Sequence, residues 1–305
     1  MAGRVLCSDE EAVRRGYRGP ANARRRQVLR ETIAALEPAD ALSRYHRLAG
    51  QNLDRWRAQS APSGSKLTIE VRPGDWGEVT LSLTQTYGEC FAVLNMANAE
   101  LPGGGYVEGA VAQEENIFRR SDCHFRVGDA ELDRELDRYR PEVTRLLSGE
   151  DGVVYLDAEH SRVCVRGPEA KDRTDLGYPW LADDTVFPFF ELRSAAQDLR
   201  GGSEFDSHDA RRRIAAQLNT LRQHGIRHVV LGAFGCGAFL NPAKHVARLY
   251  RQELAARAGD FSVVAFAIFA AGYGPDNFKP FAAVFGREEG RWAVPPCPFR
   301  YLSIC

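Results

Sequence analysis

Short apolar runs followed by glycine-rich loops place the strongest limit on how this chain folds. Residues 91–95 (FAVLN), 228–234 (HVVLGAF) and 262–269 (SVVAFAIF) resemble strands that are buried on both faces of a sheet. A glycine-rich loop and then a helical pattern follow the first two runs. This order predicts an α/β sheet whose ligand lies at the carboxyl ends of the strands.

Weaker patterns complete the predicted secondary structure. Amphipathic spacing predicts helices over residues 23–36, 42–57, 129–147, 211–224 and 242–258. Further strands are predicted over residues 67–71, 79–83, 153–156, 162–165 and 187–192. The rest of the stretch 167–206, rich in Pro, Gly and aromatic residues, is predicted to be a long loop, and the arginine run 24–26 a solvated helix face.

Composition argues against several classes of protein. The 305 residues include 40 basic and 41 acidic side chains, so the net charge favours neither nucleic acid nor an anionic membrane as a partner. No apolar run is long enough to span a bilayer, and the first residues lack the apolar segment of a secretory signal. Seven scattered cysteines without a CxxC pair, and histidines without an HExxH, indicate neither disulfides nor a metal site. We therefore expect an intracellular protein, cytoplasmic or, in a eukaryote, nuclear, that needs no metal or other cofactor.

The first loop contains three consecutive glycines. Residues 93–121 read VLNMANAELPGGGYVEGAVAQEENIFRRS, which places Asn98, then Gly103, Gly104 and Gly105, and then Gln113, Glu114 and Glu115 at the start of a helix. Three glycines let the backbone approach a ligand closely, although taken alone they favour a flexible surface turn. The two acids, taken alone, suit the solvated first turn of a helix.

The second loop lies between the run 228–234 and the helix predicted at 242–258. Its sequence, LGAFGCGAFLNP over residues 231–242, contains Gly235, Cys236, Gly237, Ala238 and Phe239. Its amides suit a phosphate at a helix N-terminus, but close packing of strand against helix explains the glycines about equally well. The loop lacks the Lys-Ser/Thr pair of a P-loop. No histidine lies near Cys236 in the sequence, so we interpret this cysteine as a small residue in a tight turn.

Together, the two loops resemble those of the poly(ADP-ribose) glycohydrolases. In that family a GGG loop precedes a QEE triplet by six to eight residues, and here the seven residues 106–112 separate them. The flanking LNMANAELP and RRS are similar to the microbial-type branch, and GAFGCGAF with Asn241 is similar to the family's diphosphate-binding loop. The segment RSAAQD (193–198) departs from the family's Ala-Ala-Pro-Asn, which bears on substrate preference more than on chemistry.

The resemblance implies a macrodomain-like, three-layer α/β/α core with a mixed central sheet and an N-terminal helical extension. We expect an accessory region over residues 1–75, a catalytic core over 76–290 and a tail over 291–305. The implied activity is a glycosidase that cleaves ribose–ribose O-glycosidic bonds of poly(ADP-ribose), or acts on ADP-ribosylated proteins, and releases ADP-ribose in the DNA damage response. We expect a monomer without a membrane partner and without sequence-specific nucleic-acid binding.

The same resemblance implies roles for individual residues. Cleavage passes through an oxocarbenium-like state, and adjacent side chains such as Glu114 and Glu115 cannot flank one bond, so a single carboxyl group, Glu115, would serve as acid and then base. Glu114, Gln113 and Asn98 would contact the terminal ribose, and Gly103, Gly104, Gly105 and residues 235–239 would surround the diphosphate. Phe239 would stack on a ribose or base. Phe278 suits an adenine pocket and the core about equally, whereas Phe281 suits the core.

Other functions stay open at this point. A non-catalytic ADP-ribose-binding macrodomain would have no chemical need for the triplet Gln113, Glu114 and Glu115. A hydrolase of single ADP-ribosyl groups on protein or nucleic acid would keep a similar pocket. A structural nucleotide-binding protein that uses the glycine loops alone is a weaker alternative.

Overall fold

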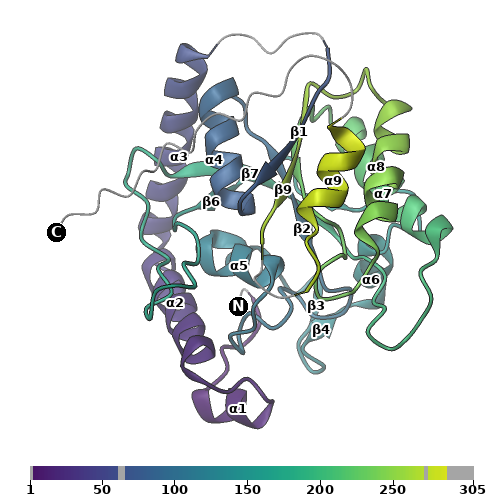
Figure 1. Cartoon of the computed structure of the whole chain (residues 1–305). Coiled ribbons are helices and arrows are strands. Elements are labelled where there is room, and N and C mark those ends of the chain that lie inside the picture. Colours follow the sequence, from purple (N-terminus) through teal and green to yellow (C-terminus); the bar gives the residue numbers. More distant parts are fainter. Residues whose placement is uncertain (1–2, 61–65, 271–273, 287–305) are drawn as a thin grey trace.

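The computed structural model describes residues 3–60, 66–270 and 274–286 (Figure 1). Its helices are α1 (Asp9–Arg14), α2 (Pro20–Leu36), α3 (Ala39–Gln59), α4 (Trp76–Tyr87), α5 (Gln113–Arg120), α6 (Pro141–Leu147), α7 (Ser207–Gln223), α8 (Ala243–Ala255) and α9 (Phe278–Phe285), with a 3₁₀ turn, η1 (Asp122–Arg126). Its strands are β1 (Thr68–Pro73), β2 (Ala92–Met96), β3 (Leu132–Asp133), β4 (Arg138–Tyr139), β5 (Tyr155–Leu156), β6 (Arg162–Cys164), β7 (Phe187–Ser194), β8 (His228–Leu231) and β9 (Val263–Ile268).

The central sheet is mixed, as the resemblance implies. Its order is β1-β9-β8-β2-β7-β5, and β6 also pairs with β7. All neighbours from β1 to β7 are parallel, whereas β5 and β6 run antiparallel to β7. The carboxyl ends of β2, β8 and β9 therefore meet at one edge of the sheet, which is where a ligand binds in folds of this kind.

Apolar side chains that alternate along the inner strands build a helical layer on each face. Val93 of β2 and Val230 of β8 belong to a core cluster with residues of α3, α4 and α5. Their neighbours Leu94 and Leu231 belong to the cluster formed with α7, α8 and α9. Successive strand residues point to opposite faces, so both faces are covered, and the three-layer α/β/α arrangement is confirmed (Figure 1). Phe281 is fully buried in the second cluster, as predicted.

Two predicted elements are wrong. Residues 79–83 belong to helix α4 and not to a strand, because Asp75 caps the helix by accepting a hydrogen bond from the Glu78 amide. Residues 129–147 are not one helix: β3 and β4 form a short antiparallel hairpin, and only Pro141–Leu147 is helical. Leu132 and Tyr139, two of the apolar positions in the helix predicted over residues 129–147, are paired across that hairpin.

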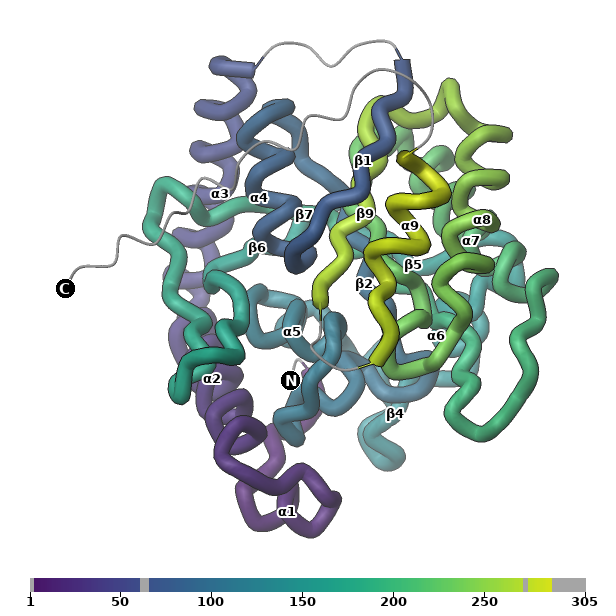
Figure 2. Tube along the Cα trace, viewed as in Figure 1, coloured from purple at the N-terminus to yellow at the C-terminus, as the bar shows by residue number. Residues whose placement is uncertain are grey.

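The arginine run 24–26 is also not the solvated face that was predicted. Arg25 and Arg26 are buried. Arg25 forms an ion pair of 2.7 Å with Glu169, and Arg26 forms one of 2.8 Å with Asp9. Helix α2 packs beside α5 (Figure 2), and its Arg25 binds Glu169, so charged residues of α2 face other parts of the chain.

The predicted division into an accessory region, a core and a tail stays a prediction. The sheet already begins within the first 75 residues, because β1 pairs with β9 along its whole length. The predicted tail, residues 291–305, lies outside the described residues. In the described part of the chain, none of the helices combines the length and the apolar character needed to cross a membrane.

Candidate functional site

The first site element is the junction between the end of β2 and the start of α5. The side-chain amide of Gln113 donates from Nε2 to the Leu94 carbonyl (2.6 Å), and its Oε1 accepts from the Met96 amide (3.0 Å). The side chain thus pairs with the strand backbone like a further strand residue. Gln113 therefore ties the first turn of α5 to the carboxyl end of β2.

Glu114 holds the loop that connects these two elements. Its Oε2 accepts from the Asn98 amide (2.7 Å) and its Oε1 from the Gly103 amide (3.1 Å). Oδ1 of Asn98 in turn accepts from the amides of Glu100 and Leu101 (2.8 and 2.9 Å). Burial, together with the neighbouring Glu115 carboxylate, raises the pKa of Glu114 well above its ordinary value.

Glu115 differs from Glu114 in how its two oxygens are used. The residue is 8% exposed, and its Oε1 accepts from the Gly105 amide (3.0 Å). Its Oε2 is buried and has no hydrogen-bond partner among the described residues. Buried polar atoms in native proteins nearly always have a partner, so this oxygen is available to a bound molecule.

The triple-glycine loop is packed closely around these carboxylates. Gly103, Gly104 and Gly105 are all buried, so the flexible surface turn is ruled out. Gly104 has a φ of +56°, and a Cβ there would lie 2.5 Å from Oε1 of Glu115 and 3.1 Å from Oε2 of Glu114. Only glycine fits both the left-handed backbone and the short approach.

The second glycine loop follows β8, which lies beside β2 in the sheet. Its base is held by Asn241, whose Nδ2 donates to the carbonyls of Gln197 (2.7 Å) and Gly235 (3.1 Å). Gly237 and Ala238 are exposed, and a Cβ on Gly237 would meet nothing within 4 Å. The loop therefore combines a fixed base with an open rim in front of helix α8, an arrangement that suits an anion.

Cys236 lies buried within this second loop. Burial raises the pKa of its thiol to about 12, so the thiolate form is disfavoured at neutral pH. This agrees with its interpretation as a small residue in a tight turn. In the part of the chain that the structure describes, no three His, Cys, Asp or Glu side chains are grouped to hold a metal ion.

Aromatic residues lie near the second loop. The guanidinium of Arg200 lies 4.9 Å from the centre of the Phe239 ring. Phe278 is half-buried against the core, at the first position of α9, and the preceding Asn277 donates to the Cys236 carbonyl (3.4 Å). Phe239 is thus part of the second loop, and Phe278 follows a residue that is hydrogen-bonded to it.

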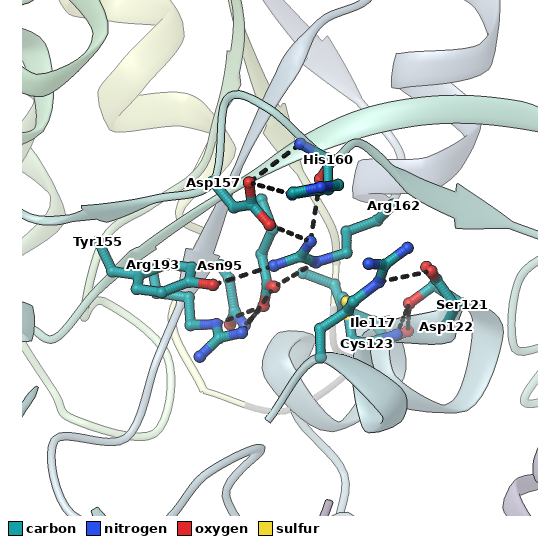
Figure 3. A network of polar contacts seen from close by, with 12 residues as sticks. Asn95, Ile117, Ser121, Asp122, Cys123, Tyr155, Asp157, His160, Arg162 and Arg193 are labelled. Carbon is teal, nitrogen blue, oxygen red and sulfur yellow. Dashed lines mark hydrogen bonds and ion pairs between the residues drawn. The ribbon is translucent and has the colours of Figure 1, made fainter. Parts of the chain in front are cut away.

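A buried ionic network is hydrogen-bonded to Asn95, near the carboxyl end of β2 (Figure 3). Asn95 donates to Oε1 of Glu191 (2.9 Å), and Glu191 pairs with Arg162 (3.0 Å) and Arg193 (2.9 Å). Burial alone would raise the pKa of Glu191, but the two arginines outweigh it and hold the pKa at about 2. The positive charge of Arg193 also acts to lower the pKa of Glu114, against the larger effect of burial.

The sequence patterns do not identify Arg4 as part of the site. Its guanidinium donates to the Gly104 carbonyl (2.6 Å) and to Oε1 of Glu108 (3.0 Å). Arg4 lies about a hundred residues before this loop and belongs to none of the predicted helices or strands. Because Arg4 lies outside every motif, the sequence alone does not predict that it contacts the site.

Comparison with known proteins identifies the first part of the site. Residues 14–140, which include the triple-glycine loop and α5, match the microbial-type PARG catalytic domain, where PARG denotes poly(ADP-ribose) glycohydrolase. This segment is therefore similar to the microbial-type PARG family. No curated protein matches the sequence.

Solved PARG structures share the fold over most of the chain. The PARG of Thermomonospora curvata is 26% identical, with a TM-score of 0.58 over 86% of this chain and 99% of that chain. The same enzyme bound to the inhibitor ADP-HPD is 25% identical, with a TM-score of 0.56 and the same coverage. PARG from Deinococcus radiodurans in complex with ADP-ribose is 24% identical, with a TM-score of 0.51 over 79% of this chain and 91% of that chain, which shows likeness of fold.

Proposed function

We propose that this chain is a poly(ADP-ribose) glycohydrolase that uses Glu115 as its acid and base. The family assignment of residues 14–140 and the PARG structures support a glycosidase of this kind. The observation that carries the assignment of Glu115 is its carboxyl group, which has one oxygen held by the Gly105 amide and the other buried without a partner among the described residues.

The chemistry requires one proton to be given and one to be taken. Cleavage of a ribose–ribose bond passes through an oxocarbenium-like state, so the leaving oxygen needs a proton and the attacking water must lose one. Glu115 would give its proton from Oε2 to the leaving oxygen and then accept one from water at the same atom. Glu114 is a poorer candidate, because both of its oxygens already accept backbone hydrogen bonds.

The rest of the site would bind the substrate. Asn98, Gln113 and Glu114 would contact the terminal ribose; their position beside Glu115 at the junction of β2 and α5 supports this role. The triple-glycine loop and the second loop would enclose the diphosphate with backbone amides. Phe239 would stack on a ribose or base, and Phe278 would contribute to the adenine side. Intracellular action as a monomer, on polymer or on ADP-ribosylated protein, is part of the same proposal.

The test is release of free ADP-ribose from an auto-modified poly(ADP-ribose) substrate. We expect release by the unaltered protein and a loss of about 10³-fold or more in Glu115→Gln, which cannot exchange the proton. Binding of ADP-ribose, measured by calorimetry, should persist in that variant. Glu100→Gln is the matched control, because Glu100 is an exposed acid in the same loop and its side chain pairs with Arg138.

Two results would contradict the proposal. Tight binding of ADP-ribose without release by the unaltered protein would indicate a non-catalytic ADP-ribose reader. Release of single ADP-ribosyl groups from mono-modified protein or nucleic acid, without action on the polymer, would indicate a mono-ADP-ribosyl hydrolase.

A further inference from the structure

Arg4, close to the start of the described residues, is in contact with the triple-glycine loop. Arg4 is 3% exposed, and its own amide donates to the hydroxyl of Tyr106 (3.0 Å). Its guanidinium donates to the Gly104 carbonyl (2.6 Å), to Glu108 (3.0 Å) and to Asp137 of the β3–β4 hairpin (2.7 Å). One side chain thus joins the triple-glycine loop to two acidic residues.

The contact with Gly104 acts on the peptide unit that holds Glu115. The carbonyl of this peptide belongs to Gly104 and accepts from Arg4, and its N–H belongs to Gly105 and donates to Oε1 of Glu115 (3.0 Å). A peptide unit is planar, so a fixed carbonyl direction also fixes the direction of the N–H. A glycine backbone is otherwise free to take several orientations, including ones that would turn the carbonyl toward the carboxylate.

The charges around Arg4 keep it in its cationic form. Burial alone would lower the pKa of Arg4, but hydrogen bonds and charge interactions with Asp137 and Glu108 outweigh it and raise the pKa above its ordinary value. A cation bonded to a peptide carbonyl polarises the peptide and strengthens the N–H on its other side as a donor. Glu108 also accepts from Arg15 (2.7 Å), so it keeps one partner if Arg4 is replaced.

We propose that Arg4 is a positioning residue for Glu115, acting through the peptide between Gly104 and Gly105. It holds that peptide so that its N–H binds Oε1 and Oε2 stays directed to the scissile bond. This inference rests on the proposed function for its kinetic consequence, but its structural consequence does not depend on activity.

The kinetic test compares Arg4→Met and Arg4→Lys with Arg15→Met. Arg15 is the matched control, because it also pairs with Glu108 and has no hydrogen bond to the triple-glycine loop. In Arg4→Met we expect kcat for ADP-ribose release to fall by roughly 10- to 100-fold, with KM changed less than about threefold, because a misaligned base slows chemistry more than binding. Arg4→Lys should recover a substantial part of that loss, and Arg15→Met should match the unaltered protein.

A folded Arg4→Met protein with unchanged kcat would overturn the inference. It would also be overturned if Arg4→Lys gave no recovery, or if KM rose in proportion to the loss of kcat. Should Arg4→Met fail to fold, the double variant Arg4→Met with Glu108→Gln removes one of the two acids that Arg4 balances, and Glu108→Gln alone is its control. The double variant must then show the loss of kcat that its control lacks.

A second measurement separates this inference from the proposed function. The amide resonance of Gly105 reports its hydrogen bond to Glu115 directly. It should move in Arg4→Met and in Glu115→Gln but not in Arg15→Met. If the unaltered protein releases no ADP-ribose and the resonance still moves in this pattern, the proposed function fails and the positioning role stands. A Gly105 resonance that stays in place in Arg4→Met overturns the positioning role whatever the activity.

Discussion

Replacing Gly104 by alanine should inactivate the site while leaving the protein folded. The added Cβ would lie 2.5 Å from Oε1 of Glu115, whereas ordinary contacts begin at 3.4 Å, so the oxygen would have to retreat by about 0.9 Å. A displacement of about 1 Å in a catalytic group costs roughly 100-fold in rate, or about 2.7 kcal/mol of barrier. The φ of +56° adds about 1–2 kcal/mol of backbone strain in the free energy of folding.

The assay is kcat for ADP-ribose release together with thermal unfolding. We expect kcat to fall about 100-fold and Tm to fall by several degrees, at roughly 2–4 °C per kcal/mol for a large domain. Gly50→Ala is the control, because Gly50 is in helix α3 and a Cβ there meets nothing within 4 Å. Its activity should be unchanged and its Tm slightly raised. A Gly104→Ala protein whose kcat stays within threefold of the unaltered protein would refute this account of how the loop and Glu115 fit together.

Three further variants test the surroundings of the site. Asn241→Ala removes the side chain that donates to the Gln197 and Gly235 carbonyls at the base of the second loop. KM should therefore rise about tenfold with little change in kcat, and an unchanged KM would contradict a binding role for that loop. Burial lowers the pKa of His124 to about 4, so the folded state favours neutral His124. The folded state therefore has its full stability above about pH 6.5 and loses stability as the pH falls toward 4. By pH 5 the loss in the free energy of unfolding is about 2 kcal/mol, and the variant His124→Asn, measured by urea unfolding, should lack it. If the free energy of unfolding of the unaltered protein and of the variant fell equally with pH, the lowered pKa of His124 would not be its cause. Glu191→Gln removes the fully buried counter-charge that Arg162 and Arg193 share, and leaves Arg193 only its ion pair with Glu131 (2.6 Å). This should cost about 3 kcal/mol in thermal unfolding, whereas a loss below about 1 kcal/mol would show that Glu131 is enough to balance Arg193.

The sequence by itself was sufficient for the main layers of the fold. The buried strands β2, β8 and β9 were predicted because strands covered on both faces must be apolar at successive positions, which is a purely local signal. The spacing of GGG and QEE carried the resemblance that implies a role for Glu115, and this role stays a prediction. These features depend on residue types at short spacing and are readable without knowledge of the fold.

Contacts between distant segments decided the β3–β4 hairpin and the partners of the buried arginines. The stripe that includes Leu132 and Tyr139 fits a helix and a hairpin equally well in sequence, and pairing of β3 with β4 selected the hairpin. Arg25 is buried only because Glu169, 144 residues later, supplies its counter-charge. Arg4 reaches Gly104 across 100 residues of chain. The burial and the partner of a charged side chain are properties of the assembled fold, because desolvation is offset only by groups that folding brings together.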